Sequence, residues 1–172
     1  MSEQKPASLY QQQKTVKPLI EDIAGDFIDG DKLRNLLDFL SFLKGHKLTP
    51  RWQSGNSWKV SYKGKGVCFI KIVGASWFVM LSALTREKCF VGYDGYFSDE
   101  LKEFVWENIK SGWCPNNCKG RSRIVFGKEF NDFCTCWAIR IENPDGVAVE
   151  LSKRLILAIK GFISDLPAVS KV

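Results

Sequence analysis

Four of the six cysteines lie in two tight pairs within residues 113–137. Cys114 and Cys118 enclose the turn-forming sequence Pro-Asn-Asn, and Cys134 and Cys136 are separated by a single threonine. Two such pairs brought together by folding are a common way to present four thiolates to one tetrahedral ion. The sequence therefore predicts a structural zinc site formed by Cys114, Cys118, Cys134 and Cys136.

The spacing leaves other interpretations of these cysteines open. Zinc-binding pairs most often have two residues between their members, whereas these pairs have three and one. The same residues could be ordinary reduced thiols, a redox pair, or ligands of an iron–sulfur cluster or another soft metal. Nearby cations, which favour thiolate over thiol, also allow a thiol-based enzyme that uses Cys134 or Cys136. Such an enzyme would be marked by a thiol that titrates well below an ordinary cysteine.

Catalytic motifs of other kinds are absent from the sequence. The only histidine, His46, follows a predicted helix in a loop, so a nucleophile–histidine pair would depend on one exposed residue. The chain contains no Gly-x-Ser-x-Gly elbow, no Walker-type phosphate loop and no His-Glu-x-x-His helix. Whether the protein is an enzyme stays open.

A basic stretch precedes the cysteines. No acidic residue occurs between Asp38 and Glu87, and this interval holds eight cations: Lys44, Lys47, Arg51, Lys59, Lys63, Lys65, Lys71 and Arg86. Aromatic side chains interleave with them, as in proteins that bind single-stranded nucleic acid. The alternative is that the aromatic residues face the core while the cations face water. The region 44–71 therefore predicts either a nucleic-acid-binding surface or a solvated face.

Lys71 departs from simple alternation. It has the same parity as Val67 and Phe69, so a strand over residues 67–73 would point it where they point. An inward lysine among aromatic side chains is a candidate for holding an anionic ligand. We therefore predict a ligand site at Trp58, Phe69, Lys71 and Trp77. The favoured function is a non-catalytic module that binds a small molecule, an anion or a metal.

The periodicity of apolar residues predicts the elements that position these groups. Helical spacing occurs over residues 16–28, 31–45 and 99–109 and again after Asn143-Pro144-Asp145. Strand patterns cover residues 58–62, 67–73, 77–83, 123–126 and 136–141, with short links between the first three. This order predicts an α+β fold, with an antiparallel β-meander, flanking helices and a C-terminal strand–helix unit. We expect residues 1–15 to be a disordered arm and residues 16–172 to be a single domain.

Composition limits the class of protein further. The chain has 172 residues, with 25 Lys+Arg against 19 Asp+Glu, and a formal net charge of +6. Its first residues are polar, unlike a secretory signal, and no apolar run is long enough to cross a bilayer. We therefore expect a cytoplasmic protein without a membrane partner, in which the cysteines are reduced or bind metal.

The C-terminal third resembles a known group of proteins. Its Phe126-Gly127-Lys128-Glu129-Phe130 sequence, the following Cys-Thr-Cys pair and Asn143-Pro144-Asp145 resemble a family of small uncharacterised bacterial proteins from Firmicutes. The meander with its helices is loosely similar to YdhG-type α+β domains, one branch of which is discussed as frataxin-like. This resemblance implies no established activity and no functional residues. It does favour a common site for the cysteines.

Overall fold

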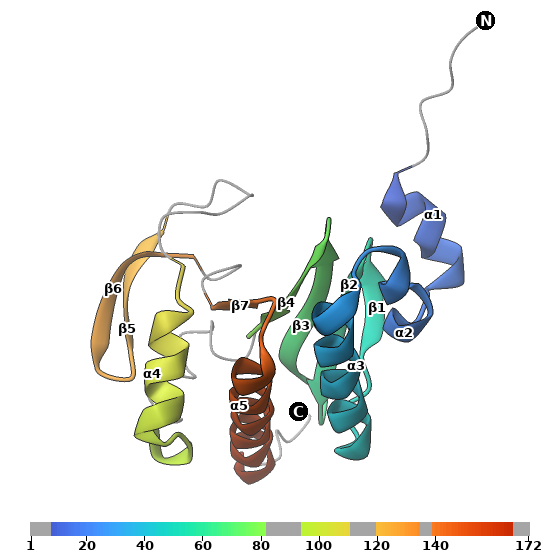
Figure 1. The fold of residues 1–172 in the computed structure, drawn as a ribbon. Helices are drawn as coiled ribbons and strands as arrows, with labels where there is room; N and C mark the ends of the chain where they lie inside the picture. The colour runs from blue at the N-terminus through green and yellow to red at the C-terminus, as the bar shows by residue number, and fades with distance from the viewer. Residues whose placement is uncertain (1–7, 82–93, 111–119, 135–138, 167–172) are drawn as a thin grey trace, which may run out of the picture.

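The computed structural model describes residues 8–81, 94–110, 120–134 and 139–166 (Figure 1). Five strands form an antiparallel sheet in the order β1-β2-β3-β4-β7: β1 (Arg51–Ser54), β2 (Ser57–Tyr62), β3 (Lys65–Val73), β4 (Ser76–Met80) and β7 (Arg140–Glu142). A separate two-stranded sheet consists of β5 (Arg121–Val125) and β6 (Lys128–Phe133). The predicted α+β fold with an antiparallel meander is confirmed.

The longer helices cover one side of the five-stranded sheet. The helical elements are α1 (Leu9–Val16), α2 (Ile20–Ile23), η1 (Ala24–Asp26), α3 (Gly30–Gly45), η3 (Asp94–Tyr96), α4 (Asp99–Glu107) and α5 (Gly146–Asp165). Helices α3 and α5 contact each other, and they also contact β4 and β3, respectively (Figure 1). None of the helices within the described ranges is long and apolar enough to cross a membrane.

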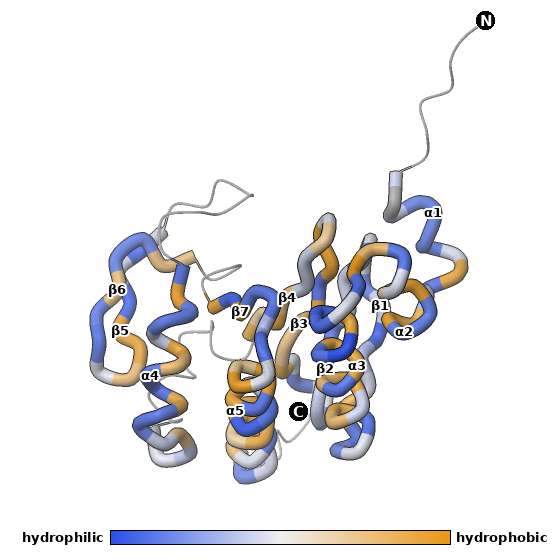
Figure 2. Tube along the Cα trace, in the orientation of Figure 1, coloured by the Kyte–Doolittle hydropathy of each residue, from blue (hydrophilic) through white to orange (hydrophobic). Residues whose placement is uncertain are grey.

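Strand register divides the sheet into two chemically different faces. The core face lies against α3 and α5 and carries the cross-strand row Trp58, Ile70, Val79 and Ile141, all buried. In Figure 2 the hydrophobic colour is concentrated along α5 and the strands near it, whereas α1 is largely hydrophilic. The opposite face carries the row Arg51, Lys59, Phe69, Met80 and Arg140, and we call it the basic face.

A β-bulge in β3, where Val67 is inserted opposite Val60 and Ser61 of β2, determines which residues of the two strands share a face. The two-residue turn at Lys63 and Gly64 pairs Tyr62 with Lys65, and an uninterrupted ladder would then pair Trp58 with Phe69. The register shifts between Val60 and Ser61, so that Trp58 pairs with Ile70 instead. One inserted residue moves the following side chains to the other face. The bulge therefore places Trp58 with Ile70 on the core face and Lys59 with Phe69 on the basic face.

The hairpins at Gly64 and Gly127 turn through left-handed conformations at two successive residues. Lys63 and Gly64 have φ of 46° and 74°, and Phe126 and Gly127 have φ of 49° and 79°. Two successive positive φ angles are typical of the tight turns whose twist matches that of antiparallel strands. The chain therefore reverses direction at Gly64 and again at Gly127.

The Asn143-Pro144-Asp145 sequence has a structural role. The Asn143 side chain accepts a hydrogen bond from the Trp77 backbone N–H at 2.9 Å and donates one to the Ser76 hydroxyl at 2.9 Å. The carboxylate of Asp145 caps α5 by accepting from the Ala148 N–H at 2.9 Å. These bonds join the start of α5 to β4. They give the Asn143-Pro144-Asp145 sequence a structural role that needs no ligand.

The N-terminal region differs from the sequence prediction. A disordered arm was expected through residue 15, but α1 begins at Leu9, and Ser8 and Gln11 form a reciprocal capping box. Only residues 1–7 of the expected arm lie outside the described residues. Helix α1 is attached to the β1–β2 turn because the side chain of Gln13 forms hydrogen bonds with that turn. The rest of the α1 sequence is mostly polar and has little to bury.

Candidate functional site: a basic hollow at the edge of the sheet

The structure separates the four residues predicted to bind a ligand. Trp58 and Trp77 are buried on the core face, at 1% and 0% exposure. The indole N–H of Trp58 donates to the Pro18 carbonyl at 2.8 Å, and the Trp77 ring packs against Phe39 with their centroids 6.0 Å apart. Both tryptophans therefore belong to the core, and they do not share a face with Phe69 and Lys71.

Phe69 and Lys71 lie together on the basic face, as their parity predicted. Both are partly buried, and burial lowers the pKa of the Lys71 ammonium. Their cross-strand neighbours on β4, Met80 and Phe78, are buried as well, and the Arg140 guanidinium lies 5.4 Å from the Phe78 ring centroid. The basic face is consequently more open toward β1 and β2 than toward β4.

A hollow of about 410 Å³ lies at this open edge. Its cationic lining comes from Lys47 after α3, Arg51 on β1 and Lys59 on β2. Its remaining lining is neutral and comes from Thr49, Trp52, Gln53, Ser61 and Gly64. None of the described residues that line this edge hollow is acidic.

Two of the three cations are direct cross-strand neighbours. Arg51 of edge strand β1 is paired in register with Lys59 of β2. Like charges in directly opposed positions destabilise an antiparallel pair, because their β-carbons are only about 4.5–5.5 Å apart. No salt bridge to an acid is present for Lys47, Arg51 or Lys59 within the described ranges. An anion bound between them would relieve this repulsion.

Further lysines lie next to the hollow, at the turn between β2 and β3. The ammonium groups of Lys63 and Lys160 lie 5.6 Å and 5.1 Å from the ring centroid of Tyr62. The pKa of Tyr62 is lowered, first by the hydrogen bond from the Ser164 hydroxyl and then by the charges of Lys63, Lys160 and Lys47. Positive charge therefore continues from the hollow to this end of the sheet.

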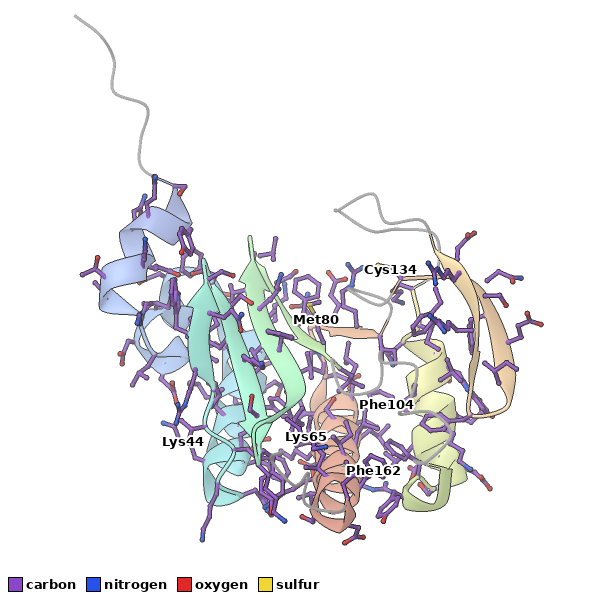
Figure 3. The ribbon with its side chains drawn as sticks, turned by 180° about the vertical axis from the view of Figure 1, so that it is seen from behind. Lys44, Lys65, Met80, Phe104, Cys134 and Phe162 are labelled. Atoms are coloured by element: carbon purple, nitrogen blue, oxygen red, sulfur yellow. The ribbon has the colours of Figure 1, made fainter. Side chains whose placement is uncertain are left out.

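Not every cation of the basic stretch contributes to this surface. The Lys44 ammonium forms a salt bridge of 2.5 Å with Glu21, in α2. Figure 3 views the molecule from behind, with Lys44 and Lys65 labelled near the lower ends of the strands and Met80 higher in the sheet. The cations beside the hollow are thus Lys47, Arg51 and Lys59, with Lys63 and Lys65 at the adjoining turn.

Helix α1 is attached to the strand that borders the hollow. The side-chain Oε1 of Gln13 accepts hydrogen bonds from the Trp52 indole N–H at 3.1 Å and from the Asn56 backbone N–H at 2.9 Å. The Gln13 amide also donates to the Asn56 side chain at 2.6 Å. On the same helix, the ring of Tyr10 stacks on Trp52 with centroids 5.8 Å apart and an interplanar angle of 24°. Trp52 therefore has contacts with both the hollow and α1.

The structure covers the predicted zinc site only in part. Cys134 is buried directly after β6, at 4% exposure, whereas Cys114, Cys118 and Cys136 lie outside the described residues. Within those residues no three histidine, cysteine or acidic side chains are grouped so that they could hold a metal ion. Cys68 is fully buried on β3, and this burial raises the pKa of its thiol. The zinc site and the thiol-based enzyme stay predictions.

Sequence reasoning missed strand β1, which supplies three of the eight residues that line the hollow. In the sequence Arg-Trp-Gln-Ser, one aromatic residue lies between polar residues, and the turn-forming residues Gly55 and Asn56 follow. That pattern is a hairpin signal, and Asn56 adopts a positive φ of 47°, a conformation that asparagine tolerates. The polar residues Thr49 and Gln53 would have been recognised as neighbours of Lys59 from this hairpin.

Comparisons of the chain with protein-family models, with curated proteins and with solved structures found no match. The resemblance to small Firmicute proteins and to YdhG-type domains therefore stays a prediction. The residues of the edge hollow are the basis on which a function can be argued.

Proposed function

We propose that this protein is a non-catalytic binding module whose ligand is a phosphate-bearing anion held in the edge hollow. The observation that carries the proposal is the cross-strand pair of Arg51 and Lys59 at the mouth of a cavity with no described acidic lining. Such a pair lowers stability unless a counter-charge lies between its members. A ligand anion supplies that charge.

The chemistry of the lining supports a phosphate group in particular. Arginine presents a planar fork of N–H donors that matches a phosphate, and lysine contributes compact positive charge. Lys47 and Lys59 provide two such charges, and the Ser61 hydroxyl and the Gln53 amide add neutral hydrogen-bonding groups. The volume of about 410 Å³ lies in the range of small-molecule sites, about 300–1,000 Å³.

This site differs from the one that the sequence predicted near Trp58, Phe69, Lys71 and Trp77. The two tryptophans are buried in the core. Of the four predicted residues, only Phe69 and Lys71 lie on the same face of the sheet as Lys59. The edge hollow lies within the basic stretch 44–71, for which the sequence predicted either a nucleic-acid-binding surface or a solvated face. The proposal therefore keeps the predicted anion and moves its site to the strand edge.

Calorimetric titration with inorganic pyrophosphate tests the proposal. We expect binding that weakens at least tenfold in Lys59→Glu, because the substitution replaces an attractive charge by a repulsive one. Lys110→Glu makes the same change in net charge at an exposed position after α4 and should bind as the unmodified protein does. Equal affinity of both variants, or no binding by the unmodified protein, would rule the hollow out as a phosphate site.

A further inference from the structure

We propose further that the ligand of the edge hollow is a single-stranded nucleic acid, with its backbone continuing from the hollow to the Lys63–Lys65 turn. This inference rests on the proposed function, since it takes the hollow as the place where one phosphate is held. It adds the class of ligand and the direction in which that ligand extends.

The first argument is the extent of the positive charge. Lys63 and Lys65 flank Gly64, which itself lines the hollow, and both are exposed. Lys160 of α5 lies on the Tyr62 ring next to them. Between Lys44 and Lys71 the sequence contains no acidic residue. Within the described part of the chain, no salt bridge joins Lys63 or Lys65 to an acid. One compact phosphate in the hollow would not neutralise these two lysines, whereas a chain of phosphates would neutralise both groups.

The second argument is an aromatic pair at the other side of the hollow. Trp52 lines the hollow, and its ring is stacked with that of Tyr10, which is 45% exposed. Single-stranded nucleic acids bind to proteins through a basic track for the backbone together with aromatic rings on which bases stack. Trp52 pairs with Trp58, so its ring lies on the core-face side of edge strand β1, one position from Arg51 on the basic face. A single strand that uses both features therefore passes over this edge of the sheet.

The aromatic pair and the hollow also favour a single strand over a duplex. The flat face of a base is accessible for stacking only when the base is not inside a duplex. The hollow is near the lower end of the size range of ligand pockets, which suits one nucleotide unit. The exposed ring of Tyr10 is the feature that a duplex would leave unused.

The experiment compares four probes on the full-length chain by fluorescence anisotropy and competition. The probes are a labelled twelve-residue oligothymidylate, a twelve-base-pair duplex, thymidine triphosphate and pyrophosphate. We expect the oligothymidylate to bind at least tenfold more tightly than the other three. Its affinity should fall with salt with a log–log slope of about −3, from about 0.7 per phosphate contact and about four contacts.

Variants separate the parts of the proposed track. Replacing both Lys63 and Lys65 by alanine should weaken oligothymidylate binding and reduce the salt slope by about 1.4, from two lost contacts, while pyrophosphate affinity stays the same. Tyr10→Ala should weaken oligothymidylate binding about tenfold without changing pyrophosphate affinity, whereas Tyr10→Phe keeps the ring and should bind normally. The unchanged pyrophosphate affinity shows that the hollow remains folded.

Each alternative outcome is informative. Equal affinity for thymidine triphosphate and the oligothymidylate, with no effect at Lys63, Lys65 or Tyr10, would overturn the nucleic-acid inference and leave the phosphate hollow intact. Tighter binding of the duplex would also overturn it. Oligothymidylate binding that is insensitive to Lys59→Glu would contradict the hollow itself, and absence of binding by every probe would contradict both proposals.

Discussion

The core face and the basic face of the five-stranded sheet are made by the same strands but carry opposite kinds of side chain. On the core face, Trp58 and Trp77 are almost completely buried against helices. On the basic face, Arg51 and Lys59 lie side by side without an acidic partner in the described part of the chain. The core face buries large apolar side chains, whereas the basic face places two like charges next to each other. The proposed anion would account for this difference, because it would neutralise the repulsion between Arg51 and Lys59.

The largest effect is expected in a region that lies on neither face. If Cys134 belongs to a four-cysteine zinc site, Cys134→Ser should remove a zinc present at about one per chain and lower stability by about 5 kcal/mol, or 10–20 °C in melting temperature. Elemental mass spectrometry and thermal melts measure both. Cys68→Ser, in the core of the sheet, is a comparison that should retain the metal. Full stability of metal-free protein would end the zinc prediction.

The next effect tests the core face directly. Trp77→Ala should destabilise the fold by about 3–5 kcal/mol, because it removes a buried aromatic ring and leaves a cavity against Phe39. Val73→Ala removes a side chain that is 57% exposed at the end of the neighbouring strand, and it should cost no more than about 0.5 kcal/mol. Denaturant unfolding measures both. Similar losses would show that the two faces do not differ in packing.

The attachment of α1 should give an intermediate effect. Gln13→Ala leaves the Asn56 groups and the Trp52 indole without their partner, and it should cost about 1–3 kcal/mol. Lys14→Ala changes an exposed residue of the same helix and should be close to neutral. A neutral Gln13→Ala would mean that α1 is not fixed to the edge of the sheet.

The smallest expected change in stability comes from a substitution on the basic face, and it tests the difference between the two faces most specifically. Lys59→Glu should stabilise the protein by roughly 0.2–1 kcal/mol, since it converts a repulsive cross-strand pair with Arg51 into an attractive one. The same change should weaken pyrophosphate binding at least tenfold. A gain in stability together with a loss of binding is the pattern expected of a functional site. Unfolding curves in low salt reveal the gain most clearly, and a loss of stability would contradict the account.

The sequence predicted much of the fold because its signals are local. Periodicity located α3, α4 and α5, and the turns at Gly64 and Gly127 were recognisable from glycine alone. The faces of β3 also followed from parity, since Lys71 does lie with Phe69. These features depend on neighbours within a few residues, so a single sequence contains them.

The site was less predictable because it depends on register between strands. Trp58 was expected to lie with Phe69, as it would in a ladder without interruption, but the bulge at Val67 pairs it with Ile70. No local sequence pattern predicts that bulge. Gln13 is a second example, because its burial depends on a turn more than forty positions away, at Asn56. Long-range contacts of this kind become visible only in the folded structure.

The most direct test of the account maps where an anion binds. Amide nitrogen–proton NMR spectra, recorded during titration with pyrophosphate, report the residues that the ligand approaches. The account predicts that the shifts will be concentrated at residues 47–53 and 59–64, with little change in α4 and α5. Shifts concentrated elsewhere, or the absence of any shift, would contradict the edge hollow as the binding site.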